Sequence, residues 1–169
     1  AQSFLAGVKA YHHHPYVRDV QDPVPLWSEG GSNLLDYGGP EDGPVLLAIP
    51  SLINKAYVLD LNGKRSFMRS MAKKGIRCFL LDWGDVGELE KKMNLSDYIL
   101  GRLSRALDEV HRLTERPVSV LGYCMGGVLT TALAALRPEK VSSLILLATP
   151  WDFHAGHGTH TRVISSSRQ

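Results

Sequence analysis

Residues 118–127 read Val-Ser-Val-Leu-Gly-Tyr-Cys-Met-Gly-Gly, and their order is the strongest indication of the fold. Residues 118–121, with two valines and a leucine, are typical of a buried strand, and residues 125–136 are typical of a helix. Between the two lies Gly-x-Cys-x-Gly, in which Cys124 has a glycine two residues away on each side. This order predicts a nucleophile elbow, a turn so tight that the flanking positions must be small.

Cys124 at such an elbow is predicted to be a catalytic nucleophile. Its side chain would stand at the carboxyl edge of the sheet, above a helix N-terminus whose dipole favours a thiolate. The amide of Met125, the next residue, would point at a developing oxyanion. The alternative is a cysteine that only packs in a tight glycine turn. Cys78 lies within the apolar run 76–81 and is predicted to be a core residue.

On both sides of the elbow, apolar runs alternate with helical patterns along residues 31–148. This alternation, with short connections, predicts an α/β fold with a mostly parallel sheet and right-handed crossovers. With the elbow, it indicates an α/β-hydrolase fold. We expect strands at 33–37, 45–49, 76–81, 118–121 and 141–148, a helix around 67–71 that stops at Gly75, and a helix over 125–136. A longer helix capped by Ser96 is expected to carry an apolar stripe of Leu100, Leu103, Leu107, Val110 and Leu113.

The composition bounds the class of protein. The 169 residues carry 19 Lys and Arg against 17 Asp and Glu, a net charge of +2, and 44% are hydrophobic. These values exclude a disordered tail and give no electrostatic case for a nucleic-acid partner. No apolar run approaches the ~20 residues that a membrane span requires. Without a leader pattern, and with only two cysteines, a cytoplasmic location is expected.

The chain divides into three parts by pattern. Residues 1–30 are loosely patterned, contain three prolines and are expected to form an N-terminal arm. Residues 31–153 are expected to be a partial catalytic domain, and residues 154–169 a tail of uncertain structure. Since the first residue is Ala1 and the last stretch is aperiodic, we expect a piece of a longer protein. Its sheet would be truncated after the strand that follows the nucleophile helix.

Five motifs resemble, in the same order along the chain, those of the polyhydroxyalkanoate synthases. The box at 122–127, Gly-Tyr-Cys-Met-Gly-Gly, is similar to that family's lipase-like box. Residues 50–61 resemble its Pro-Pro-Trp-Ile-Asn-Lys stretch, although Ser51-Leu52 stands where the family has Pro-Trp. Three further segments also look like family motifs: Tyr11 with His14-Pro15-Tyr16-x-Arg18, Leu81-Asp82-Trp83-Gly84, and Thr149-Pro150-Trp151-Asp152-Phe153.

The resemblance implies an acyltransferase with a cysteine nucleophile. Such an enzyme would take an (R)-3-hydroxyacyl group from coenzyme A onto Cys124 as a thioester and extend a polyester chain. The backbone amides of Met125 and Ile53 would form the oxyanion hole. The coenzyme A thioester is a substrate, so no resident cofactor is expected. The implied partners are a polyester granule and either a second copy or a partner subunit.

The acid and base of a catalytic triad are not expected within this chain. In this fold they follow the nucleophile on loops after later strands, in the order acid and then histidine. Asp152 matches a different family motif, and His154, His157 and His160 fall where the resemblance has ended. Without a base a cysteine loses most of its activation, so the 169 residues alone are expected to be inactive.

No metal site is expected. The three consecutive histidines His12, His13 and His14 would point in different directions from an extended arm, which does not close a coordination shell. These residues are interpreted as surface and family-like sequence.

Two other functions remain open on the sequence. A related Cys-dependent hydrolase would pass the acyl group to water, because the fold and the nucleophile do not choose the acceptor. A non-catalytic relative would instead bind a polymer granule or a partner subunit. Whatever the function, a sheet truncated at this point would leave its apolar last strand as an open edge, which invites aggregation. The isolated piece is therefore expected to be poorly soluble or only partly folded.

Overall fold

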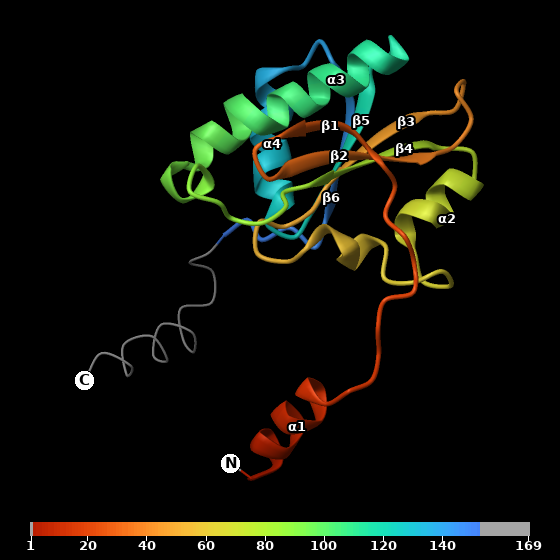
Figure 1. Ribbon diagram of the computed structural model, residues 1–169. Helices are drawn as coiled ribbons and strands as arrows, with labels where there is room; N and C mark the ends of the chain where they lie inside the picture. Colours follow the sequence, from red (N-terminus) through yellow and green to blue (C-terminus); the bar gives the residue numbers. More distant parts are fainter. Residues whose placement is uncertain (1, 153–169) are drawn as a thin grey trace.

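A twisted sheet forms the centre of the computed structural model, which describes residues 2–152 (Figure 1). Its strand order is β1-β2-β4-β3-β5-β6. Strands β4, β3, β5 and β6 run parallel, whereas β1 and β2 pair antiparallel at one edge, so the predicted mostly parallel sheet is confirmed. The strands are β1 (Pro25–Glu29), β2 (Ser32–Gly38), β3 (Val45–Ile49), β4 (Arg77–Asp82), β5 (Val118–Tyr123) and β6 (Val141–Leu147).

Helices cover both faces of this sheet (Figure 1). Helices α3 (Ser104–Thr114) and α4 (Gly126–Leu136) pack on one face, and α2 (Phe67–Lys73) and the short η1 (Ala56–Leu59) on the other. Between β4 and α3 lie η2 (Glu90–Lys92) and the π-helical η3 (Asp97–Leu103). Helix α1 (Gln2–His12) stands apart from the sheet and buries no residue. None of the helices in residues 2–152 has the length and apolar content that a membrane span requires.

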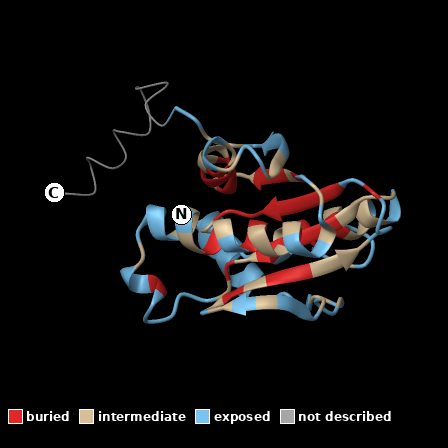
Figure 2. Ribbon diagram, turned by 90° about the horizontal axis from the view of Figure 1, so that it is seen from above, coloured by how far each residue is buried: buried red, intermediate tan, exposed pale blue. Residues whose placement is uncertain are grey.

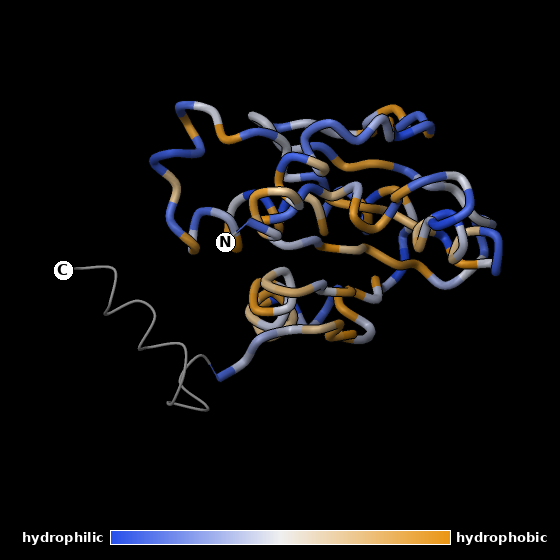
Figure 3. Tube along the Cα trace, turned by 90° about the horizontal axis from the view of Figure 1, so that it is seen from below, coloured by the Kyte–Doolittle hydropathy of each residue, from blue (hydrophilic) through white to orange (hydrophobic). Residues whose placement is uncertain are grey.

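The buried residues run along the central strands (Figure 2), which are also the hydrophobic parts of the trace (Figure 3). Every residue of β3 is buried, because helices cover both of its faces and strands lie on both sides. Leu47 pairs in register with Phe79 on β4 and with Val120 on β5. Cys78 is fully buried in this core, as predicted.

The sheet begins earlier in the chain than expected. Strand β1 lies inside residues 1–30, which the sequence pattern assigned to an arm, and it pairs with β2. Trp27 on β1 packs against the core, but the strand's burial is only partial. An edge strand of five residues with proline at its start carries little apolar periodicity, which is why the pattern did not show it.

The prediction that Ser96 caps the long helix is wrong. Ser96 already has helical backbone angles, and its side chain makes no capping bond. Asn94 and Asp97 cap the helix reciprocally instead: the Asn94 amide donates to Asp97 Oδ2 at 2.8 Å, and the Asp97 amide donates to Asn94 Oδ1 at 3.1 Å.

The expected apolar stripe of this helix is correct only in its centre. Leu103, Leu107 and Val110 are fully buried, whereas Leu100 is 61% exposed and Leu113 is 42% exposed. The wider turns of the π-helical segment rotate Leu100 away from the face that α3 turns to the sheet.

Strand β6 lies at the other edge of the sheet and is the most exposed of the parallel strands. Its residues Leu144, Ile145, Leu146 and Leu147 are 37–47% exposed, in contrast to the buried β3. The expected open apolar edge is therefore present in residues 2–152. The predicted tail, 154–169, lies outside the described residues.

Candidate active site

Cys124 occupies the turn between the end of β5 and the start of α4. Its φ angle is +52°, in the left-handed region that non-glycine residues rarely adopt. Such a strained residue between a strand and a helix is the geometry of a nucleophile elbow. The Cys124 side chain is half-buried. Cys78 is different, because burial raises the pKa of its thiol to about 11.

The glycines of the box are required by close backbone contacts. A Cβ atom on Gly122 would overlap the backbone of Gly127, at the start of α4. A Cβ atom on Gly126 would overlap the carbonyl oxygens of Ile49 and Pro50, at the end of β3. Helix α4 can therefore pack against the carboxyl ends of two strands only because these positions lack side chains. The motif brings the elbow and the loop after β3 together.

The end of β6 holds the elbow from the other side. The Cys124 amide donates to the Leu147 carbonyl at 2.9 Å, and the Gly127 amide donates to the Cys124 carbonyl at the same distance. Thr149 packs against Gly127, and its hydroxyl lies 3.5 Å from the Gly122 carbonyl. The motif that begins at Thr149 thus contacts the elbow directly.

The two amides expected to form an oxyanion hole are placed differently. Met125 precedes the first turn of α4, where backbone amides have no carbonyl partner within the helix, as an oxyanion donor requires. The Ile53 amide, however, donates to Ser51 Oγ at 3.1 Å, and the Ile53 side chain is 79% exposed. An oxyanion could receive the Ile53 amide only if that bond were released.

A hydrogen bond from β4 fixes the start of the loop at 50–55. The indole of Trp83 donates to the Pro50 carbonyl at 3.1 Å, and Trp83 is itself packed edge-on against Tyr98. Next to this bond lies a cavity of about 270 Å³, at the carboxyl ends of β3 and β4. Leu52, Ile53, Asn54, Trp83 and Val86 are among the residues that line it.

None of the histidines within residues 2–152 hydrogen-bonds to Cys124. Within residues 2–152, no hydrogen bond reaches the Cys124 sulfur. The His111 ring pairs with the Arg116 carbonyl at 2.9 Å, and His13 and His14 pair within their own segment. No group of metal-ligating side chains occurs in that part of the chain either. Three histidines considered as bases, His154, His157 and His160, lie outside the described residues.

Comparison with known proteins agrees with this geometry. The family described as "alpha/beta hydrolase fold" matches residues 44–161, which include the elbow and the strands around it. The chain belongs to the α/β-hydrolase fold family. The thioesterase domain of the curacin biosynthetic pathway superimposes with a TM-score of 0.62 at 20% identity, over 86% of this chain and 52% of that one.

Within this family, the resemblance to polyhydroxyalkanoate synthases is also confirmed. This α/β-hydrolase chain is 38% identical over 108 residues to the poly(3-hydroxyalkanoate) polymerase subunit of Haloferax mediterranei. It is 36% identical over 120 residues to the same subunit of Allochromatium vinosum. These matches include 63% and 69% of this chain, but only 22% and 33% of the relatives. The chain therefore spans less than two thirds of their length.

The sequence patterns did not indicate which residues hold the loop and the turn of this site in place. Trp83, Arg18 and Asp60 lie within the family-like segments 81–84, 14–18 and 50–61, but the motifs assign them no role. Trp83 binds the loop after β3, and Asp60 is a fully buried carboxylate. For Asp60, the signal in the sequence was a carboxylate between two leucines, Leu59 and Leu61.

Proposed function

We propose that this chain carries the nucleophile of an acyltransferase of the polyhydroxyalkanoate synthase type, with an (R)-3-hydroxyacyl-coenzyme A as substrate. The observation that supports it most is a cysteine at the strained elbow, in a chain that is 36–38% identical to two poly(3-hydroxyalkanoate) polymerase subunits. Most of the other lipase-like features of the box are shared with hydrolases, but the sulfur nucleophile fits thioester exchange.

In the first half-reaction the Cys124 thiolate attacks the carbonyl carbon of the thioester. A new carbon–sulfur bond forms, and the electron pair of the carbonyl moves to its oxygen. When this oxyanion collapses, the bond to the coenzyme A sulfur breaks, and coenzyme A leaves with the proton that the cysteine lost. Because one thioester replaces another of similar energy, the acyl group stays reactive.

In the second half-reaction a hydroxyl oxygen attacks the acyl-Cys124 carbonyl. The hydroxyl belongs to another hydroxyacyl unit or to the end of a polyester chain. An ester bond forms, the bond to Cys124 breaks, and the cysteine recovers a proton. The chain is one unit longer, and the enzyme is ready for the next substrate.

The described residues supply part of the machinery for these steps. The Met125 amide at the helix N-terminus stabilises the oxyanion, joined by the Ile53 amide once this amide leaves Ser51 Oγ. In the whole enzyme, an Asp and a His from outside residues 2–152 would supply the base for Cys124. We therefore expect the 169-residue chain to accept one acyl group on Cys124 without turnover. The whole enzyme would work in the cytoplasm at its polyester granule, as a homodimer or with a partner subunit.

A mass-spectrometric experiment tests the proposal. The 169-residue chain is incubated with 3-hydroxybutyryl-coenzyme A at alkaline pH, where thiols ionise without a base. We expect a single covalent acyl adduct on the peptide that contains Cys124. Cys124→Ala removes the adduct, and the control Cys78→Ala keeps it because the Cys78 thiol is buried.

The other outcomes identify the alternatives. Release of the free hydroxy acid from the adduct much faster than alkaline hydrolysis of a free thioester would make the protein a Cys-dependent hydrolase. The absence of any adduct from the folded chain, or an adduct on Cys78, would overturn the proposal and favour a granule- or partner-binding relative.

A further inference from the structure

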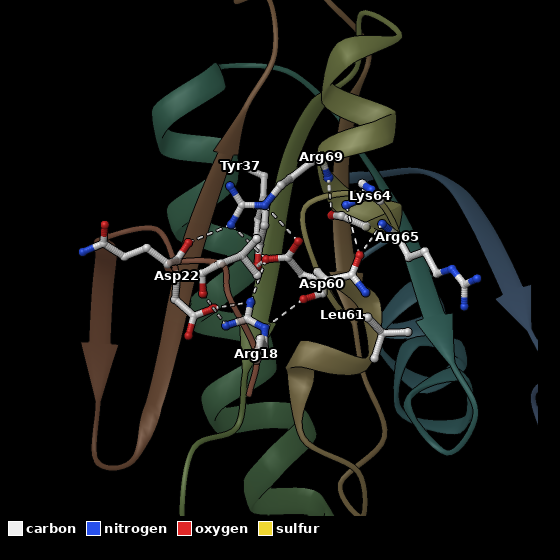
Figure 4. Close-up of polar contacts among 12 residues, drawn as sticks. Arg18, Asp22, Tyr37, Asp60, Leu61, Lys64, Arg65 and Arg69 are labelled. Atoms are coloured by element: carbon white, nitrogen blue, oxygen red, sulfur yellow. Dashed lines mark hydrogen bonds and ion pairs between the residues drawn. The ribbon is translucent and has the colours of Figure 1, made fainter. Parts of the chain in front are cut away.

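Asp60 is the centre of a buried charge cluster that the reaction does not use (Figure 4). Its side chain has no exposed surface, although it follows η1 at the start of a surface loop. Two arginines and a tyrosine surround it. A carboxylate is buried at such a cost only when its partners hold it in one place.

Each partner of Asp60 comes from a different part of the chain. Arg69 on α2 binds it at two points, Nε to Oδ1 at 2.9 Å and Nη2 to Oδ2 at 3.0 Å. Arg18, from the segment before β1, donates Nη2 to Oδ2 at 2.8 Å and Nε to the Asp60 carbonyl at 3.0 Å. Tyr37 on β2 donates its hydroxyl to Oδ2 at 3.1 Å. We name Arg18, Tyr37, Asp60 and Arg69 the Asp60 clasp.

The Asp60 clasp also fastens the N-terminal segment to the body of the protein. Tyr16 donates its hydroxyl to the Leu61 carbonyl at 3.2 Å, beside the clasp. Arg69 Nη2 donates to the Gln21 carbonyl at 2.7 Å, and Arg18 pairs with Asp22. Two family-like motifs, at 14–18 and 50–61, therefore meet at this point.

Electrostatics keeps Asp60 ionised. Burial by itself would raise the pKa of Asp60, but hydrogen bonds from Arg69 and Ser66 and the positive charge of Arg69 outweigh burial and lower it. The carboxylate lies between two guanidinium groups that would otherwise face each other. Loss of its charge would leave two like charges in contact and loosen all of the connected segments.

The Asp60 clasp lies at one end of the loop that borders the elbow. Helix η1 connects residues 50–55 to Asp60, and its buried Ala56 and Leu59 pack in the same cluster as Leu121 of β5. At the other end, Pro50 is held by the Trp83 indole and contacts Gly126. The loop at 50–55 is therefore fixed at both ends, and one end depends on Asp60.

We propose that Asp60 is a positioning residue, which holds the loop at 50–55 in place beside Cys124 through its contacts with Arg18 and Arg69. The proposal rests on the proposed function for the role of this loop as a wall of the acyl-transfer site. By the same contacts, the N-terminal segment at 16–22 supports the active site from outside.

Asp60→Asn tests the proposal, with Asp36→Asn as a matched control. Asp36 also binds an arginine, Arg77, at two points and is part-buried, but it lies at the amino edge of the parallel strands, away from the loop. Two measurements are compared: hydrogen exchange of the amides at 51–55, and the rate at which 3-hydroxybutyryl-coenzyme A acylates Cys124. Alkylation of Cys124 by iodoacetamide, which needs no oxyanion hole, corrects for access to the sulfur.

We expect Asp60→Asn to speed exchange at 51–55 and to slow acylation about tenfold or more, while alkylation changes less than about twofold. Asp36→Asn should change neither. Unchanged exchange at 51–55 in folded Asp60→Asn, or the same change in Asp36→Asn, would overturn the proposal. If Asp60→Asn does not fold, Arg18→Gln replaces it, because this variant keeps the Asp60–Arg69 pair. Arg18→Gln is expected to speed exchange at 51–55 and to slow acylation by a smaller factor. If it changes neither, the proposal is also overturned.

The exchange measurement separates this inference from the proposed function. Faster exchange at 51–55 in a chain that never becomes acylated would refute the acyltransferase and leave the positioning contact standing. If Cys124 is acylated, but neither Asp60→Asn nor Arg18→Gln changes exchange at 51–55 or the acylation rate, the acyltransferase stands and the positioning role of Asp60 is refuted.

Discussion

The backbone amide of Cys124 donates a 2.9 Å hydrogen bond to the carbonyl oxygen of Leu147. The strained nucleophile position is therefore tied to the last residue of β6, the exposed edge of the sheet. Because a left-handed residue keeps its conformation only where its surroundings impose it, the geometry of the elbow depends on the order of this edge. The following predictions address the elbow, the edge and the charges that hold the fold.

Gly122→Ala is predicted to destabilise the fold strongly. The added Cβ would overlap the backbone of Gly127, so β5 and α4 would have to separate. We expect a loss of about 3 kcal/mol in the free energy of unfolding, at the upper end of the usual cost of overpacking. Urea unfolding followed by circular dichroism measures it. The control Gly7→Ala, with no atom near the added Cβ on α1, should leave the main transition unchanged.

Leu146→Lys is predicted to reduce self-association of the 169-residue chain. Leu146 is 47% exposed within the apolar run of β6, and a lysine on an open edge opposes strand pairing between molecules. Sedimentation at increasing concentration measures the effect. Leu113→Lys is the control, since Leu113 is similarly exposed, at 42%, but lies on helix α3 and not on an edge of the sheet. A monomeric wild-type chain with a sharp cooperative melt would contradict this prediction.

Acid is predicted to destabilise the fold partly through Glu90. Hydrogen bonds from Arg102 and from the Gly31 amide lower the pKa of Glu90 from 4.5 to about 2. Since the pKa is lower in the folded state, this stabilisation is complete above about pH 4.5 and is lost as the pH falls toward 2.

The variant Glu90→Gln should therefore be less stable than the wild type at neutral pH, with a difference that shrinks between pH 5 and pH 2. Urea midpoints across this range provide the measurement. Glu88→Gln serves as the control, because Glu88 and its partner Lys91 are both largely exposed and such pairs contribute little. If the stability of Glu90→Gln and of Glu88→Gln changed equally with pH, Glu90 would not be a source of the acid sensitivity.

Only one of the two cysteines is predicted to react in the native chain. Cys124 is half-buried at the elbow, whereas Cys78 has no exposed surface and a thiol pKa raised by burial to about 11. Intact-mass analysis after iodoacetamide treatment should show one modification, and two in urea. Cys124→Ala should show none until the chain is unfolded, and rapid native modification of Cys78 would refute the prediction.

The sequence predicted the parts of the fold that follow from local pattern. Apolar runs identified β3, β4 and β5, because central strands covered on both faces bury most of their side chains. The apolar run at the end of β6 identified that strand too, although it lies at an exposed edge. The sequence did not predict β1, and it chose Ser96 as a cap where Asn94 and Asp97 act. The cap depends on which side chains reach free amides, and the position of Leu100 depends on a π-helical turn, neither of which the spacing of residues determines.

The elbow follows from local sequence, since a cysteine between two glycines at a strand–helix junction is the pattern of such a tight turn. The surroundings of the elbow depend on how distant segments pack together. The bond between Cys124 and Leu147, the bond from the Trp83 indole to Pro50, and the burial of Asp60 between Arg18 and Arg69 each join residues by their folded positions. Contacts such as that of Arg18 with Asp60, 42 residues apart, form only when packing brings distant segments together.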